Sequence, residues 1–312
     1  MSHIFDALQR SEGERAGVEP DSFSLTRQLL KIANTDAPTP EPAQQVEKID
    51  LSLPGEVRPL AESSNPLDQF ESLPVTIAPD GRLVSVTEKD SLAAEKFRFL
   101  AVRLRQMQQN RPLKKVLITS TIPEEGKSMI AANLACTLAR RQQQKILLVE
   151  GDLRRPTVAR LLGLNKLPGV TEWLQGPQAA KMNIYRLEAL GFWILPAGSA
   201  AQNPLELMQS GRLSPMMEQL AAWFDWIVID SPPVLPLADT SVWARLADGI
   251  LLVTRQGTTE KQQLRRGIEA LEPKKLLGAL VNGSGDAARG DYYNRYGVSS
   301  DPGKHKSEES RK

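Results

Sequence analysis

The tripeptide Gly126-Lys127-Ser128 carries the residue types that bind nucleotide phosphates. In such a loop, backbone N–H groups surround the phosphates, the lysine reaches the β- and γ-phosphates, and the serine hydroxyl binds Mg²⁺. The usual pattern G-x-x-x-x-G-K-[ST] has a glycine where this chain has Thr121, which is small enough to replace it if its φ angle stays negative. Taken alone, the tripeptide is also compatible with an ordinary surface turn.

Two acidic segments supply the carboxylates that a magnesium site needs. Glu150 and Asp152 stand in "LLVEGDLRRP", and Asp230 ends the apolar run "WIVID". Each alone is compatible with a solvated acid at the end of a strand. Beside a phosphate loop they predict a metal–phosphate site, because Mg²⁺ prefers oxygen ligands. Arg154 and Arg155 either steady phosphate or a neighbouring subunit, or form a solvated basic turn.

Short apolar runs that alternate with amphipathic segments must position these residues. Strands are predicted at residues 114–119, 145–149, 192–197, 226–230, 249–255 and 276–282, and helices at 90–110, 128–143, 205–222 and 260–270. Continuous apolar runs are typical of strands buried on both faces, and crossover helices require parallel pairing. The predicted fold class is therefore α/β, a doubly wound and mostly parallel sheet of the P-loop NTPase type. Such sheets bind ligands at the carboxyl ends of their strands.

Composition divides the chain into three parts. Residues 1–85 include the proline-rich stretch "NTDAPTPEPAQQ" and are predicted to be mostly disordered, with short helices. Within this part, the apolar residues of "IFDALQR" either belong to a solvated linker or form a docking face for a partner. Residues 86–284 are expected to form the folded domain, and residues 285–312 a flexible tail.

The bulk composition argues against several classes of protein. The charges nearly cancel, leaving a formal net charge of +2 over 312 residues, so no nucleic-acid partner is expected. Cys136 is the only cysteine, and His3 and His305 lie near the ends, so neither a disulfide framework nor a zinc site is predicted. No apolar run approaches the ~20 residues of a membrane helix, and no signal peptide is evident. We expect a cytoplasmic protein without a membrane span.

Tyrosines cluster near the C-terminus. Three of the four tyrosines, Tyr292, Tyr293 and Tyr296, fall in "DYYNRY", within a segment that has no apolar periodicity. They either pack back on the domain as an aromatic tail or serve as phosphate acceptors. A tethered tail has a raised local concentration near the active site of a neighbouring copy, which favours the acceptor interpretation.

Three motifs in order carry a family resemblance. "TSTIPEEGKS", "LLVEGDLRRP" and "FDWIVIDSPPVLPLADTS" resemble the bacterial tyrosine kinases of capsule and exopolysaccharide synthesis, the CpsD/CapB type, which are P-loop relatives of the MinD/ParA ATPases. The resemblance covers about residues 86–296. Three positions depart from the family pattern: Glu124 replaces a glycine, Glu150 replaces an aspartate, and Ala101 replaces the last arginine of the helical motif E-x-x-R-x-x-R used in ring assembly.

The resemblance implies an ATP-dependent protein-tyrosine autokinase that regulates exopolysaccharide or capsule synthesis and export, with ATP and Mg²⁺ as ligands. The catalytic residues would be Lys127, Glu150, Asp152 and Asp230. Glu150 would orient or deprotonate the attacking tyrosine. The residues expected to contact ATP are Thr121, Glu125, Gly126, Lys127, Ser128, Met129 and Asn282. Those expected to hold Mg²⁺ are Ser128, Asp152 and Asp230.

The same resemblance implies partners. It predicts phosphorylation of Tyr292, Tyr293 and Tyr296 in trans, within a homo-oligomer held by contacts between the tail and a neighbouring copy. It also predicts a membrane chain-length-determinant activator of the Wzz type, which would recruit the protein to the inner face of the plasma membrane.

Two other functions are compatible with the motifs. One is an ATPase switch of the MinD/ParA class, although those proteins carry a second lysine where this chain has Ile122. The other is a nucleotide-binding regulator without catalysis, which the replacements Glu124 and Glu150 favour.

Overall fold

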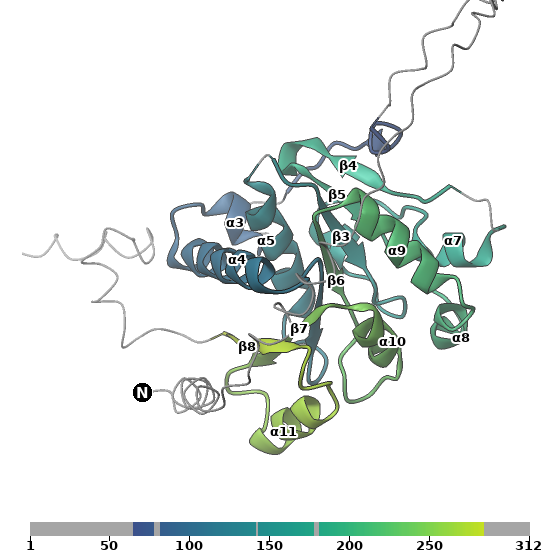
Figure 1. The fold of residues 1–312 in the computed structure, drawn as a ribbon. Helices are drawn as coiled ribbons and strands as arrows, with labels where there is room; N and C mark the ends of the chain where they lie inside the picture. The colour runs from purple at the N-terminus through teal and green to yellow at the C-terminus, as the bar shows by residue number, and fades with distance from the viewer. Residues whose placement is uncertain (1–64, 78–81, 142, 178–180, 284–312) are drawn as a thin grey trace, which may run out of the picture. The chain divides into compact units, whose positions relative to one another are not determined.

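The computed structural model describes residues 65–77, 82–141, 143–177 and 181–283 (Figure 1). The tail tyrosines and the N-terminal "IFDALQR" stretch lie outside the described residues. One sheet of eight strands lies between two layers of helices (Figure 1). The strands are β1 (Glu71–Ser72), β2 (Lys115–Ser120), β3 (Ile146–Glu150), β4 (Tyr185–Leu187), β5 (Phe192–Leu195), β6 (Trp226–Asp230), β7 (Gly249–Arg255) and β8 (Leu276–Asn282).

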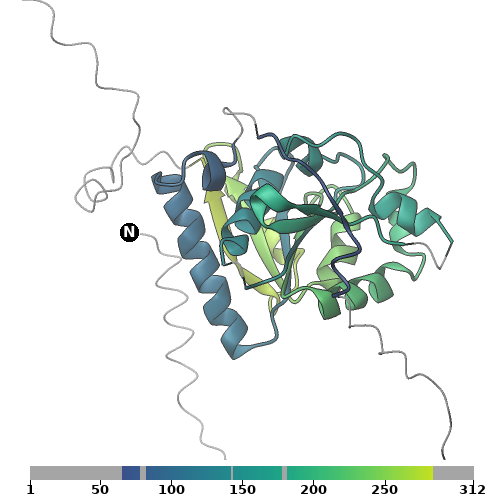
Figure 2. The same cartoon turned by 90° about the horizontal axis from the view of Figure 1, so that it is seen from above.

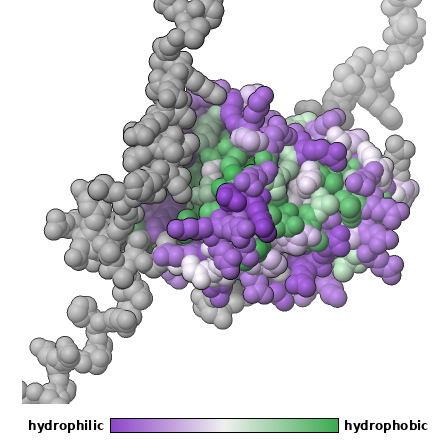
Figure 3. Space-filling view, turned by 90° about the horizontal axis from the view of Figure 1, so that it is seen from below, coloured by the Kyte–Doolittle hydropathy of each residue, from purple (hydrophilic) through white to green (hydrophobic). Residues whose placement is uncertain are grey.

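The helices divide between the two faces of the sheet (Figures 1 and 2). One face is covered by α3 (Val84–Thr87), α4 (Leu92–Asn110), α5 (Lys127–Ala139) and α6 (Val158–Leu161). The other is covered by α7 (Val170–Gln175), α8 (Pro204–Met208), α9 (Leu213–Trp223), α10 (Asp239–Leu246) and α11 (Lys261–Glu269). A 3₁₀ turn, η1 (Glu188–Leu190), joins β4 to β5. Seen from below, hydrophilic residues surround patches of hydrophobic ones on the surface (Figure 3).

The sheet confirms the predicted fold class. Its strand order is β1-β4-β5-β3-β6-β2-β7-β8, and every neighbouring pair is parallel except β4 with β5. β6 lies between β2 and β3, so the three strands that carry the expected site end side by side. In such a sheet the carboxyl ends of the strands form the ligand-binding edge.

Burial on both faces explains why the strands are apolar throughout. In β3, Leu147 and Val149 pack with the α7–α10 side of the core, whereas Ile146 and Leu148 pack with the α4–α6 side. Successive side chains of a strand point to opposite faces, so each face needs its own apolar set. The central strands therefore hold the site on a rigid, fully buried frame.

Two expectations about the elements are wrong. The single helix predicted at 205–222 is split into α8 and α9, because Gly211 adopts a positive φ of 80° between them. The folded domain also begins before residue 86: Leu67, Phe70 and Leu83 are buried in the core, and β1 pairs with β4. Within the described ranges, no helix has both the length and the apolar composition needed to cross a membrane.

Candidate active site

The phosphate loop connects β2 to α5 with its backbone open to a cavity. Gly126 caps α5 with a positive φ of 93°, and a Cβ there would lie 2.2 Å from Nδ2 of Asn282. Only glycine fits this conformation and this contact. The first N–H groups of α5 have no partner within the helix, so the start of the helix is a ready site for an anion.

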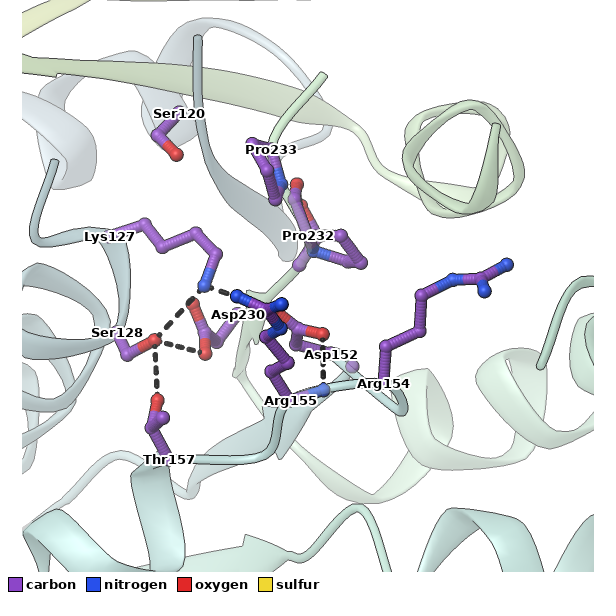
Figure 4. Close-up of polar contacts among 12 residues, drawn as sticks. Ser120, Lys127, Ser128, Asp152, Arg154, Arg155, Thr157, Asp230, Pro232 and Pro233 are labelled. Atoms are coloured by element: carbon purple, nitrogen blue, oxygen red, sulfur yellow. Dashed lines mark hydrogen bonds and ion pairs between the residues drawn. The ribbon is translucent and has the colours of Figure 1, made fainter. Parts of the chain in front are cut away.

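Three elements bring charged and hydroxyl groups together in front of this loop (Figure 4). Nζ of Lys127, at the start of α5, lies 3.1 Å from Oδ2 of Asp152, which follows β3. The hydroxyl of Ser128 donates to Oδ2 of Asp230, at the end of β6, at 2.7 Å. Nζ of Lys127 is also 3.4 Å from Oγ of Ser128. The structure thus joins the predicted lysine, serine and two aspartates into one cluster.

The buried carboxylate of Asp230 has one oxygen that is available to bind a cation. Its side chain is fully buried, and its Oδ1 has no hydrogen-bond partner among the described residues. Burial raises the pKa of Asp230 to about 7, against the opposing effects of the Lys127 charge and the Ser128 hydrogen bond. A buried carboxylate oxygen without a partner is costly unless a cation or proton satisfies it. The residues present therefore fit a divalent cation.

The ligand types fit magnesium in particular. Across the described part of the chain, no three Asp, Glu, His or Cys side chains gather into a metal cluster. The protein ligands available are the Ser128 hydroxyl and the carboxylates of Asp152 and Asp230. Mg²⁺ commonly binds through one or two carboxylates and completes its shell with phosphate oxygens and water.

A cavity of 920 Å³ opens in front of the cluster. Of the residues expected at the site, those that line it are Gly126, Lys127, Ser128, Met129, Asp152, Arg154 and Arg155. Asp230 lies behind Ser128 and reaches the cavity through that hydroxyl. The volume is within the range of pockets that hold small molecules and cofactors.

Three residues expected to contact the nucleotide lie outside the cavity lining, and two of them, Glu125 and Asn282, support the loop through hydrogen bonds. Thr121 is fully buried, and none of Thr121, Glu125 and Asn282 lines the cavity. Oε2 of Glu125 accepts the N–H of Ile122 at 2.8 Å, and its Oε1 accepts the hydroxyl of Thr259. Nδ2 of Asn282 donates to the carbonyl oxygen of Glu125 at 2.9 Å. The loop is therefore held by its own glutamate, which the sequence pattern does not reveal.

Comparison with known proteins decides the family. No protein-family model matches the sequence. The tyrosine-protein kinase YwqD of Bacillus subtilis (strain 168) is 34% identical over 212 residues, which cover 67% of this chain and 89% of YwqD. The chain belongs to the bacterial tyrosine-protein kinases. The family and the enzyme class predicted from the motifs, protein-tyrosine kinase, are thus confirmed.

Two further matches agree with this membership. The succinoglycan biosynthesis transport protein ExoP of Rhizobium meliloti (strain 1021) is 32% identical over 197 residues, which cover 62% of this kinase but 25% of ExoP. The kinase domain of the Escherichia coli tyrosine kinase ETK has a TM-score of 0.60 at 27% identity, covering 64% of this kinase and 79% of the ETK chain. These results favour a kinase over the ATPase switch and the non-catalytic regulator.

Glu150 does not occupy the place expected of a catalytic carboxylate in this kinase. It is 1% exposed, and it does not line the cavity. Its Oε1 accepts the N–H of Val158 at 2.6 Å and that of Ala159 at 3.4 Å, and its Oε2 accepts the N–H of Ala197 at 3.1 Å. Burial raises the pKa of Glu150, and these backbone hydrogen bonds oppose the rise. Both oxygens of Glu150 accept backbone N–H groups, so neither is directed at the cavity where the tyrosine is expected.

The two neighbouring arginines of the kinase differ in direction (Figure 4). Arg154 forms a bidentate ion pair with the buried Asp239 of α10, at 2.6 Å and 3.0 Å. The hydrogen bond to Asp239 raises the pKa of Arg154. Arg155 lines the cavity, and its backbone N–H donates to Oδ1 of Asp152 at 3.0 Å. Arg154 therefore fastens the loop after β3, and Arg155 faces the cavity.

Sequence reasoning missed Thr157, which also lines the cavity. Its hydroxyl donates to Oγ of Ser128 at 3.0 Å, so a chain of hydrogen bonds runs from Thr157 through Ser128 to Asp230. The signal available in the sequence was its place in "GDLRRPT", five residues after the expected carboxylate of Asp152. Glu150 accepts the N–H groups of the two residues after Thr157, and these hydrogen bonds also fix the position of the Thr157 hydroxyl.

Proposed function

We propose that this kinase transfers the γ-phosphoryl group of ATP to Tyr292, Tyr293 and Tyr296 in the tail of another copy, and thereby regulates exopolysaccharide or capsule synthesis and export. The observation that carries the proposal is the convergence of Lys127, Ser128, Asp152 and Asp230 at the start of α5. The tail is the acceptor expected from the clustered tyrosines of the sequence.

Nucleotide binding follows from the loop and its neighbours. The N–H groups of the loop and the ammonium of Lys127 bind the β- and γ-phosphates. Ser128 and Asp230 would hold Mg²⁺, which would satisfy the buried carboxylate oxygen of Asp230 that lacks a partner, and Asp152 would contribute through a bound water molecule. Bound Mg²⁺ supplies charge neutralisation at the transferred phosphoryl group.

The transfer itself needs a proton acceptor and charge stabilisation. The phenolic oxygen of tyrosine forms a bond to Pγ, the bond from Pγ to the β–γ bridging oxygen breaks, and ADP leaves. Free tyrosine has a pKa of about 10, so its proton must move to a base during attack. Asp152 takes this proton, because its carboxylate lines the cavity beside Lys127 whereas both oxygens of Glu150 bind backbone. Lys127 and Arg155 stabilise the charge on the transferred group.

Phosphosite mapping by mass spectrometry after incubation with Mg·ATP tests the reaction. We expect phosphate on the tail tyrosines of the unaltered chain and of Lys166→Ala, an exposed lysine that does not line the cavity. We expect no phosphate in Lys127→Ala. Phosphate on the tail of Lys127→Ala incubated alone would contradict the assignment of the site.

Transfer between copies is tested by mixing two full-length chains. One is Lys127→Ala, which keeps its tail tyrosines but lacks the catalytic lysine. The other is active and carries phenylalanine at positions 292, 293 and 296. Transfer in trans predicts phosphate on the tail of the Lys127→Ala chain. Phosphorylation of unaltered protein that does not depend on its concentration would indicate transfer within one copy.

We also propose that a membrane chain-length-determinant protein of the Wzz type activates this kinase and recruits it to the inner face of the plasma membrane. Support comes from the family and from the similarity to ExoP, a succinoglycan biosynthesis transport protein. The test is copurification with such a protein and a rise in tail phosphorylation on its addition. Absence of both effects with a properly inserted partner would contradict recruitment.

A further inference from the structure

Positive charge is concentrated around the cavity of a nearly neutral chain. The formal net charge of the chain is +2. The cations that line the cavity are Arg82, Lys127, Arg154, Arg155, Arg160 and Arg255, and the carboxylates that line it are Glu124 and Asp152. A concave surface with one sign of charge focuses the electric field and attracts ligands of opposite charge. Because cationic side chains outnumber carboxylates in its lining, the cavity favours the binding of an anionic ligand.

Four of these cations have no role in the transfer described above, and one of the four, Arg255, donates a hydrogen bond to the carbonyl oxygen of Glu124. Lys127 pairs with Asp152, and Arg154 pairs with Asp239. Arg82 and Arg160 are exposed at the cavity, and within the described ranges neither side chain has an ion-pair or hydrogen-bond partner. Their guanidinium groups are thus free to bind an anion that enters the cavity.

Buried polar side chains hold the backbone at both arginines. Nδ2 of Asn133, which is fully buried, donates to the carbonyl oxygen of Arg82 at 2.9 Å. The buried carboxylate of Glu150 accepts the N–H groups of Val158 and Ala159, at the start of the short helix α6 that carries Arg160. The two guanidinium groups therefore extend into the cavity from fixed backbone positions.

The net charge of the tail indicates which form of it the cationic cavity would bind. Residues 283–296, "GSGDAARGDYYNRY", contain two aspartates and two arginines, so the unmodified tail has no net charge. One phosphate on a tyrosine adds about −1.5 to −2 charge at neutral pH and three strong acceptor oxygens. The modified tail therefore matches the cationic cavity, whereas the unmodified tail does not.

We propose that Arg82 and Arg160 form a subsite for a phosphotyrosine of the tail, so that a singly phosphorylated tail is a better acceptor than an unmodified one. This inference rests on the proposed phosphorylation of the tail. Guanidinium groups bind phosphate through paired, charge-assisted hydrogen bonds. Tyr292, Tyr293 and Tyr296 lie within five residues of one another, so one phosphorylated tyrosine holds another near the transferred phosphoryl group.

Kinetics with tail peptides test the subsite. The enzyme is the full chain with phenylalanine at 292, 293 and 296, so that its own tail does not compete. The substrates are peptides of residues 283–300, either unmodified or phosphorylated at one tyrosine. We expect the KM of at least one phosphorylated peptide to be about tenfold lower than that of the unmodified peptide. A peptide with glutamate in place of that phosphotyrosine should fall between them, since it carries less charge.

The double variant Arg82→Gln/Arg160→Gln should reduce this tenfold preference to less than about twofold. The KM values for unmodified peptide and for Mg·ATP should stay unchanged, since neither arginine takes part in transfer. Arg265→Gln, whose side chain is 72% exposed on α11, is the matched control and should keep the preference. Equal KM values for the two peptides, a preference that survives in the double variant, or a raised KM for Mg·ATP would each overturn the proposal.

Binding separates this inference from the proposed function. Calorimetry with Mg·ADP measures the affinity of each peptide without transfer. We expect the phosphorylated peptide to bind about tenfold more tightly, in a manner that depends on Arg82 and Arg160 and weakens with added salt. This result would support the subsite even if no peptide were phosphorylated, an outcome that would contradict the acceptor assignment alone. Equal affinities would overturn the subsite whatever the activity.

Discussion

Glu150 and Asp230 are buried carboxylates that end neighbouring strands, and their Cα atoms are partners in the β3–β6 register. Their sequence contexts look alike, because each follows a run of apolar residues. The structure gives them opposite tasks. Glu150 uses both oxygens to bind backbone N–H groups, whereas Asp230 binds one hydroxyl and keeps Oδ1 without a partner among the described residues. A carboxylate at the binding edge of a sheet is thus a ligand only where no backbone donor faces it.

The extra methylene of glutamate contributes to this difference. It lets the carboxylate of Glu150 span from the end of β3 to Val158 on one side and Ala197 on the other. Asp230 is shorter and meets the Ser128 hydroxyl at the start of α5. The replacement of the family's aspartate by glutamate therefore occurs where the carboxylate fastens loops.

The largest effect should come from Asp230→Asn, which removes the negative charge that the buried partnerless oxygen offers to Mg²⁺. We expect the rate of phosphoryl transfer, measured in single-turnover assays with Mg·ATP, to fall by at least about 10²-fold. Asp68→Asn, at an exposed aspartate, is the matched control. A loss smaller than about threefold would remove Asp230 from the metal site.

Glu150→Gln should lose stability and, through it, activity. The amide of glutamine places a donor against a backbone N–H, so we expect the free energy of unfolding in urea to fall by about 1–3 kcal/mol. Transfer should slow as α6 and Thr157 shift, with Glu150→Asp intermediate in both measurements. A Glu150→Gln chain with unchanged stability and abolished transfer would instead restore the catalytic role expected from the sequence.

The pH dependence of stability in metal-free protein should report the burial of Asp230. The folded pKa of Asp230, about 7, is above its ordinary value of 3.8, so the folded state binds more protons than the unfolded state between these values. The free energy of unfolding therefore falls as pH rises through this window. Asp230→Asn should be more stable than the unaltered chain at pH 8, and the difference should shrink at pH 5. Equal stability at pH 8 would show that burial does not strain this carboxylate.

Thr157→Val tests the Thr157 hydroxyl, which lies between the backbone segment bound by Glu150 and the metal site. The change keeps the shape of the side chain but removes the donor to Ser128. The Mg²⁺ concentration for half-maximal transfer should therefore rise by a few-fold, as expected for the loss of about one hydrogen bond. A calorimetric titration of Mg²⁺ in the presence of ADP should show the same few-fold loss of Mg²⁺ affinity. Thr258→Val, at an exposed threonine, should behave like the unaltered chain.

The smallest effect concerns Glu124, which has a positive φ of 65° where the family has glycine. A side chain in this region is strained, so Glu124→Gly should raise the free energy of unfolding by up to about 1 kcal/mol. Glu124→Ala keeps the Cβ and the strain, and should show no gain in urea denaturation. A gain of the same size in both variants would point to removal of charge as the cause.

Much of the fold was predictable because its signals are local. The apolar runs of β2, β3, β6 and β7 and the Gly-Lys-Ser at the start of α5 lie in contiguous sequence, and the structure has these strands within one or two residues of their predicted bounds. β1 and β4 were not predictable, since each is two or three residues long and exists only through pairing. The early start of the domain was missed because its few apolar residues lie in polar, proline-containing sequence.

The sequence by itself determined the phosphate loop, the order of the three motifs and the family, because these depend on residue types at fixed spacing along one strand–loop–helix unit. Only the tertiary structure decided which carboxylate stays available. Loops distant in sequence deliver the N–H groups that occupy Glu150, and α5 delivers the hydroxyl that meets Asp230. Hydrogen-bond partners depend on where the strands end relative to other elements. The pattern of a single sequence does not reveal those relative positions.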